Sequence, residues 1–165
     1  MIERCRFCEI INGSQNNEEV IFENESYIVI TDRFRMTSIG PICLIITKKH
    51  KQNILKLDEI EGKGLIFILH IVLKAMQNAL NNKGFRIWTA INKEAGQSIL
   101  HFHMHIVPCN SIKDRMIANF PGIYDLFIKI SKRKEQLESQ NFMLAEKIRK
   151  EIQTGIANNT NDNIT

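Results

Sequence analysis

Short hydrophobic segments bounded by turn residues predict the strands of this chain. Residues 19–31 carry β-branched and aromatic side chains on both sides of Glu23-Asn24-Glu25, which predicts two short strands joined by a turn. After a loop at 32–41, the uninterrupted apolar run ICLIIT at 42–47 predicts a buried strand. Further strands are predicted at 85–92 and 99–107.

The hydrophobic pattern becomes helical between Asp58 and about Asn82. Apolar side chains recur three and four residues apart, at Leu65, Leu69, Val72, Met76 and Leu80. Gly84 follows as a residue that readily adopts the left-handed conformation found at helix ends. The segment therefore predicts one long amphipathic helix.

Beyond about residue 120 the chain is charged and helical in pattern. Apolar residues spaced by seven allow one side of a coiled-coil seam, or a helix laid on the domain or on a partner: Ile123, Ile130, Leu137 and Leu144. Lys134 and Asn141 interrupt the other side of a seam and favour the second arrangement. We expect a domain at 1–115, a helical extension at 116–153, and a polar tail without regular structure at 154–165.

Composition and charge narrow the class of protein. A chain of 165 residues suits one domain, and 44% hydrophobic with 24% charged residues is ordinary for a soluble protein. The net charge of +4 is dispersed, which predicts mild attraction to phosphorylated ligands but no nucleic-acid surface. No apolar run reaches the ~18–20 residues that span a membrane, and the start MIERCRFCEI lacks a signal-peptide core. We expect a cytoplasmic protein that does not bind membranes.

Three of the five histidines alternate with apolar residues in the stretch HFHMHIVP at 101–108. Successive side chains of a strand point to opposite faces, so His101, His103 and His105 share one face. The apolar residues between them face the core. Packing that core does not require histidines on the opposite face of the strand. Serine or threonine would suit that face better, because each imidazole needs hydrogen-bond partners or water. The pattern therefore predicts chemistry.

Clustered imidazoles support two kinds of chemistry. Histidine is a common metal ligand near neutral pH. A neutral imidazole also attacks phosphorus without a separate base, and neighbouring donors then stabilise charge on the phosphoryl oxygens. The preceding turn, Ala95-Gly96-Gln97-Ser98, favours the second chemistry, because small residues let backbone N–H groups approach an anion.

The cysteines give a second candidate site. Four cysteines are too few for a disulfide framework in a chain of this length. The C-x-x-C pair of Cys5 and Cys8 indicates half of a metal site, a redox pair or two inert thiols. Cys43 and Cys109 are expected to be an apolar strand residue and a loop thiol.

The segment AGQSILHFHMHIVP resembles the signature of the histidine-triad family of nucleotide hydrolases and transferases. Three further features are similar to that family in order and spacing: CRFCEI near the N-terminus, Asp32 after YIVIT, and LIITKKH at a strand end. The resemblance covers residues 3–108. It implies an α+β fold, in which an antiparallel five-stranded sheet carries one long helix and joins a second sheet in a homodimer. It leaves the C-terminal helical extension unexplained.

The resemblance also implies a site and a mechanism. The central histidine, His103, is the expected nucleophile, which attacks the α-phosphorus of a nucleotide and forms a nucleotidyl-histidine that water resolves. The expected phosphate-binding and nucleoside-binding residues are His105, Ser98, Gly96 and Gln97 for the phosphate, and Asp32 and Asn92 for the nucleoside. Substrates of the family are nucleoside phosphoramidates, dinucleoside polyphosphates and related conjugates.

A zinc site follows from the same resemblance. Family members with the C-x-x-C opening hold zinc through four side chains, which here are Cys5, Cys8, His50 and His101. Two thiolates and two imidazoles make a closed tetrahedral set, which is typical of structural zinc. The alternative is a pair of unmetallated thiols beside a hydrogen-bonded His101.

The chain departs from the family pattern at Pro41-Ile42, where Gly-His usually precedes the strand, and in a longer loop after Asp32. The expected activity is hydrolysis of a nucleotidyl bond. Transfer of the nucleotidyl group to another phosphorylated molecule is a second possibility, although Met104 stands where the large uridylyltransferases have proline. A nucleotide-binding dimer with little catalysis, whose C-terminal helix recruits partners, is a third.

Overall fold

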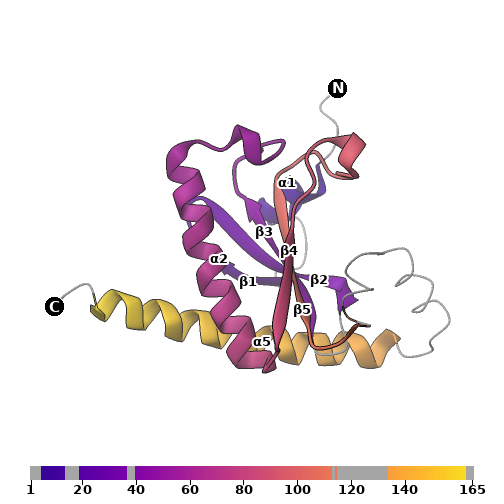
Figure 1. The fold of residues 1–165 in the computed structure, drawn as a ribbon, viewed down its shortest axis with the longest axis vertical. Helices are drawn as coiled ribbons and strands as arrows, with labels where there is room; N and C mark the ends of the chain where they lie inside the picture. The colour runs from indigo at the N-terminus through magenta and orange to yellow at the C-terminus, as the bar shows by residue number, and fades with distance from the viewer. Residues whose placement is uncertain (1–4, 14–18, 37–39, 113, 115–133, 163–165) are drawn as a thin grey trace.

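One antiparallel sheet forms the centre of the molecule (Figure 1). The computed structural model describes residues 5–13, 19–36, 40–112, 114 and 134–162, without the side chains of 32–36, 134–141 and 158–162. Within these residues five strands pair in the order β1-β2-β3-β5-β4, which confirms the expected α+β fold. They are β1 (Val20–Glu23), β2 (Tyr27–Met36), β3 (Pro41–Thr47), β4 (Gly84–Trp88) and β5 (His103–Cys109).

Strand β3 lies in the middle of the sheet, and every one of its residues is buried. Cys43 and Ile45 belong to the hydrophobic cluster on one face, whereas Ile42, Leu44 and Ile46 belong to the cluster on the other. A strand covered on both faces needs apolar side chains at every position. This is why the apolar run at 42–47 lacks the polar alternation of a half-exposed strand.

Helix α2 (Glu59–Leu80) covers the first of these faces. It begins with a capping box, in which Asp58 accepts a hydrogen bond from the Glu61 N–H at 2.8 Å and the Glu61 carboxylate accepts one from the Asp58 N–H at 2.9 Å. It ends at Asn81 in the left-handed conformation (φ 49°), so the expected stop at Gly84 is corrected by three positions. By length and composition α2 also passes as a membrane-spanning helix, but its buried side packs on the sheet as a core helix does.

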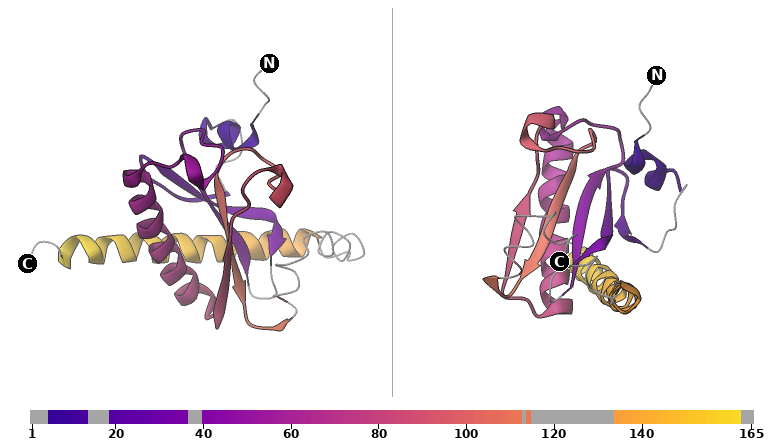
Figure 2. Two further views of the ribbon diagram at one scale, coloured as in Figure 1. Left: turned by 45° about the horizontal axis from the view of Figure 1, so that its top comes forward. Right: turned by 90° about the vertical axis from the view of Figure 1, so that its right-hand side faces the viewer.

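Helix α5 (Lys134–Asp162) packs against α2 and the same face of the sheet, and extends beyond the sheet on both sides (Figure 2). Ala145, Ile148 and Ile152 are buried in the same cluster as the side chains of α2. The C-terminal helix is therefore laid on its own domain. It continues to Asp162, which corrects the tail expected from residue 154, because Ile156 still packs against the core. The first part of the expected helical extension, residues 116–133, lies outside the described part of the chain.

Three strands differ from their expected bounds. Strand β4 ends at Trp88 rather than at residue 92. Strand β2 runs on through the loop expected at 32–41, since it resumes pairing with β3 at Met36 after an irregular stretch. Strand β5 starts at His103 rather than Ile99 and includes Pro108. Pairing of β5 with β3 ends at Ile106, so the missing N–H of Pro108 interrupts no ladder on that side.

Helix α1 (Arg6–Ile11) covers the other face of the sheet, and the sequence pattern had not indicated it. Phe7 and Ile10 are buried against apolar residues of β2 and β3. This packing brings the C-x-x-C segment over the end of β5, where the histidines lie.

Candidate functional site

The three clustered histidines share one side of β5 and its approach, as the alternation predicted. His103 and His105 point away from Phe102, Met104 and Ile106, which are buried in the cluster beneath α2. His101 precedes the strand by two residues and continues the alternation. All three imidazoles are buried: His101 is 0% exposed, and His103 and His105 are each 8% exposed. His103 and His105 therefore expose only a small part of their surface, and His101 exposes none.

His103 is held in one tautomer. Its Nδ1 lies 2.8 Å from the backbone carbonyl oxygen of His101, which can only accept a hydrogen bond, so Nδ1 carries the proton. The lone pair is then on Nε2. Burial lowers the pKa of His103 below its ordinary 6.5, and the hydrogen bond to His101 partly opposes that shift. His103 is thus a neutral imidazole with one nucleophilic nitrogen.

Aromatic rings surround the triad. The Phe7 ring lies 5.0 Å from that of His103, and the His103 and His105 rings meet at 71° with centroids 5.1 Å apart. Trp88 stacks on His105. The sequence pattern missed Phe7 and Trp88, because only the fold of α1 and the register of β4 against β5 bring them to the histidines.

The loop before β5 is organised by Gln97. This side chain is 3% exposed; its amide donates to the carbonyls of Gln52 (2.6 Å) and Ile99 (3.0 Å) and accepts from the Asn92 N–H (2.8 Å). Asn92 has φ 68°, a conformation that glycine adopts easily, and its side-chain oxygen accepts from Asn53 at 3.0 Å. Both residues therefore shape the loop.

The expected phosphate donors lie at this loop. The N–H groups of Gly96 and Gln97 donate to the carbonyls of Lys93 and Asn92, so a phosphate contact from them would share those bonds. Ser98 is exposed at the end of the loop. Asp32 belongs to β2, and its side chain lies outside the described part of the chain. Ile42, at the position of the missing histidine, is buried in the apolar cluster beside α1.

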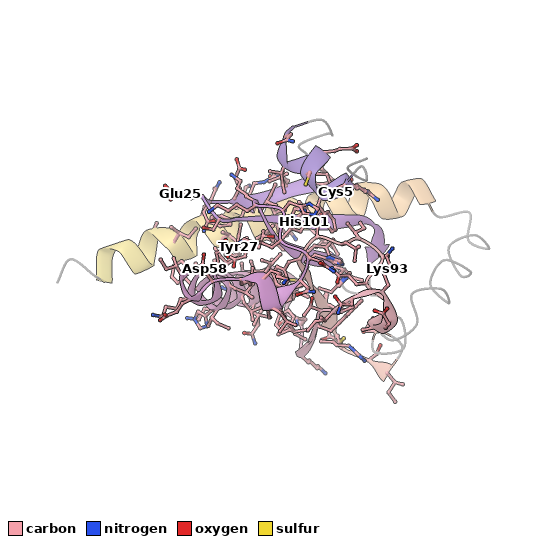
Figure 3. The ribbon with its side chains drawn as sticks, turned by 90° about the horizontal axis from the view of Figure 1, so that it is seen from above. Cys5, Glu25, Tyr27, Asp58, Lys93 and His101 are labelled. Atoms are coloured by element: carbon pink, nitrogen blue, oxygen red, sulfur yellow. The ribbon has the colours of Figure 1, made fainter. Side chains whose placement is uncertain are left out.

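The four predicted metal ligands meet at one point. Cys5 and Cys8 come from the start of α1, His50 from the segment after β3, and His101 from the approach to β5; Figure 3 shows Cys5 beside His101. The four donor atoms lie within 4.8 Å of one another. The Cys8 sulfur is 3.2 Å from His50 Nδ1 and 3.5 Å from His101 Nδ1, and the Cys5 sulfur is 3.4 Å from His101 Nδ1.

This geometry fits a tetrahedral cation. Ligand atoms around zinc are separated by roughly 3.3–3.8 Å when its bonds are about 2.0–2.3 Å. His101 Nε2 lies 2.7 Å from the Thr47 carbonyl oxygen and so carries the proton, which leaves the Nδ1 lone pair facing the sulfurs. Burial and then the neighbouring Cys5 raise the pKa of the Cys8 thiol to about 11. A bound cation would remove that cost by stabilising the thiolate.

His101 connects the two sites. Its ring belongs to the four-residue cluster, while its backbone carbonyl fixes the tautomer of His103. The backbone carbonyl of Thr47 holds the His101 ring, and the sequence pattern had not indicated Thr47 as part of the site. A cation at the cluster would therefore order the segment that orients His103.

Comparisons with known proteins agree with this arrangement. The HIT domain model matches residues 13–112. An uncharacterized HIT-like protein of Saccharolobus solfataricus is 32% identical over 116 residues, which cover 70% of this chain and 81% of the relative.

Among solved structures, a hypothetical histidine triad nucleotide-binding protein from Sulfolobus tokodaii is 26% identical, with a TM-score of 0.65 over 91% of this chain and 93% of its own. A HIT family hydrolase from Clostridium thermocellum is 29% identical, with a TM-score of 0.54 over 66% and 93%. A zinc-bound histidine triad family protein from Mycobacterium smegmatis has a TM-score of 0.67 over 92% and 96%, at 22% identity, and shares the fold.

The family model covers all five strands of the sheet, helix α2 and all three clustered histidines. The chain therefore belongs to the HIT family.

Proposed function

We propose that this protein hydrolyses a nucleotidyl bond, in a nucleoside phosphoramidate or a dinucleoside polyphosphate, through a covalent intermediate on His103. The observation that carries this proposal is the hydrogen bond from His103 Nδ1 to the His101 carbonyl, which leaves Nε2 as a buried, neutral nucleophile. The likeness to a HIT family hydrolase supports it.

The chemistry proceeds in two displacements. His103 Nε2 attacks the α-phosphorus, the bond from phosphorus to the leaving amine or phosphate breaks, and the leaving group takes a proton from solvent. Water then attacks the same phosphorus and releases a proton to solvent, the P–N bond breaks with its electron pair returning to Nε2, and a nucleoside monophosphate leaves. His105 and Ser98 would donate hydrogen bonds to the phosphoryl oxygens, and Asp32 and Asn92 would bind the nucleoside.

The four-residue cluster would hold zinc as a structural ion. The likeness to a zinc-bound family member supports this assignment, together with the convergence of Cys5, Cys8, His50 and His101. Such an ion would tie α1 to the strand that carries His103. Its contribution lies in folding, because all four positions of a tetrahedron are taken by side chains.

The protein would act in the cytoplasm as a homodimer that pairs through β4. Among the described strands β4 has one neighbour, β5, so one row of its backbone groups is open. At the opposite edge of the sheet, the Val20 carbonyl of β1 accepts a hydrogen bond from Arg149 of α5 at 2.7 Å. Ile87 on β4 is 40% exposed and Phe67 on α2 is 55% exposed. Light scattering should give a molar mass twice the 19.1 kDa of one chain. Ile87→Asp should lower that mass to the mass of a single chain.

A substrate panel tests the activity. It comprises adenosine phosphoramidate, diadenosine tri- and tetraphosphate, and a nucleotide sugar with inorganic phosphate as acceptor. We expect release of nucleoside monophosphate, and a loss of about a thousandfold or more in His103→Ala. His70→Ala, on the exposed side of α2, is the matched control and should retain turnover. Mass spectrometry of the quenched enzyme should find the nucleotidyl group on His103.

Two outcomes would favour the other functions. Turnover that requires added phosphate or a phosphorylated acceptor would indicate a nucleotidyltransferase. Nucleotide binding without turnover of any substrate would indicate a binding module and would overturn the proposed hydrolysis.

A further inference from the structure

Trp88, the single tryptophan of the chain, lies flat against His105. The two ring centroids are 4.0 Å apart and the ring planes differ by 7°. The contact follows from strand pairing, because Trp88 on β4 is directly opposite His105 on β5. One face of the His105 imidazole is thus covered by the indole, and the tilted ring of His103 adjoins it.

The indole is not oriented by a hydrogen bond. Its Nε1 is buried and has no hydrogen-bond partner among the described residues. A buried N–H without an acceptor is unfavourable, and buried tryptophans usually satisfy it. Here the ring is oriented by its stacking on His105. We infer that stacking on His105 places the indole N–H where it has no acceptor, at some expense in stability.

We propose that Trp88 is a positioning residue that locks the His105 ring as a hydrogen-bond donor to the phosphoryl group. This inference rests on the proposed function. The stack restricts rotation of the imidazole, so its N–H is aimed before the substrate binds.

Two substitutions separate stacking from simple packing. Trp88→Leu removes the π-face, and Trp88→Phe keeps a smaller one. We expect Trp88→Leu to lower kcat about tenfold and to raise KM by no more than about fivefold, and Trp88→Phe to recover most of kcat. Phe85→Leu is the matched control, because Phe85 is on the same strand but packs against the hydrophobic cluster on the opposite, α2 side. It should leave kcat unchanged.

Two readouts do not depend on turnover. The imidazole Cε1–H proton of His105, assigned with His105→Gln, should be shifted upfield by the indole in the native protein and return downfield in Trp88→Leu. The affinity for adenosine monophosphate, measured by calorimetry, should fall about fivefold in Trp88→Leu and remain native in Phe85→Leu.

The outcomes distinguish this inference from the proposed function. The native protein could turn over no substrate while Trp88→Leu binds adenosine monophosphate more weakly than the native protein does. That outcome would overturn the proposed hydrolysis and leave the role of Trp88 intact. If Trp88→Leu keeps native kcat and native nucleotide affinity, the positioning role is overturned, whatever the protein hydrolyses. An unshifted His105 proton would likewise overturn it, because the stack would not exist in solution.

Discussion

Replacing Ile148 by alanine tests whether α5 is part of the hydrophobic core. Ile148 is 0% exposed in the cluster that joins α5 to α2 and the sheet. The substitution removes three carbon atoms, which at about 0.8 kcal/mol per buried carbon amounts to about 2.4 kcal/mol of lost transfer free energy. The remaining cavity adds about 1–2 kcal/mol where neighbouring side chains do not close it. We expect the free energy of unfolding to fall by about 3.4–4.4 kcal/mol.

Urea unfolding followed by far-UV circular dichroism measures this change. Met143→Ala, on the same helix with the side chain 64% exposed, is the matched control and should change the free energy of unfolding by less than about 0.5 kcal/mol. Turnover by folded Ile148→Ala should be native, since α5 packs on the face opposite the histidines. If Ile148→Ala lowers the free energy of unfolding by less than about 1 kcal/mol, α5 does not stabilise the domain.

Three further predictions concern the site. Cys8→Ser should abolish the zinc content measured by atomic absorption, whereas Cys109→Ser should keep it, because only Cys8 belongs to the four-ligand cluster; equal zinc in both variants would exclude the cluster. Burial lowers the pKa of folded His103 below 6.5, so the unfolded chain binds more protons below that pH. The titration of His103 should therefore make the free energy of unfolding rise with pH up to about 6.5. The acid limb of kcat/KM should have its midpoint below 6.5, and a midpoint above 6.5 would contradict the assignment of His103 as the nucleophile. Gln97→Ala should cost about 1–3 kcal/mol in urea unfolding, since it strips buried hydrogen bonds from the loop, whereas the exposed Gln52→Ala should be nearly neutral.

The local pattern was sufficient for the elements whose environment is periodic. The alternation in HFHMHIVP placed the histidines on one face, and the spacing of leucines in α2 marked its buried side. Both succeed because a strand or helix packed on one side repeats the same environment at a fixed interval. Element ends were less well determined. The helix stop depended on which residue, Asn81 or Gly84, took the left-handed conformation, and the pattern allows either.

The tail was misjudged for a related reason. Residues 154–162 are polar, and in isolation they have too little apolar surface to fold. They are helical because the preceding turns of α5 are anchored in the core and Ile156 extends that contact. Contacts far apart in the sequence supply this stabilisation, and composition does not report them.

The residue types present already define the available chemistry: imidazoles that attack phosphorus, and a Cys₂His₂ set that suits zinc. Which imidazole does which task is decided by tertiary contacts, because a tautomer depends on the acceptor beside each nitrogen. The Thr47 carbonyl directs His101 toward the thiols, and the His101 carbonyl leaves Nε2 of His103 for attack. The Trp88 stack arises in the same way, from a strand register that no local pattern encodes.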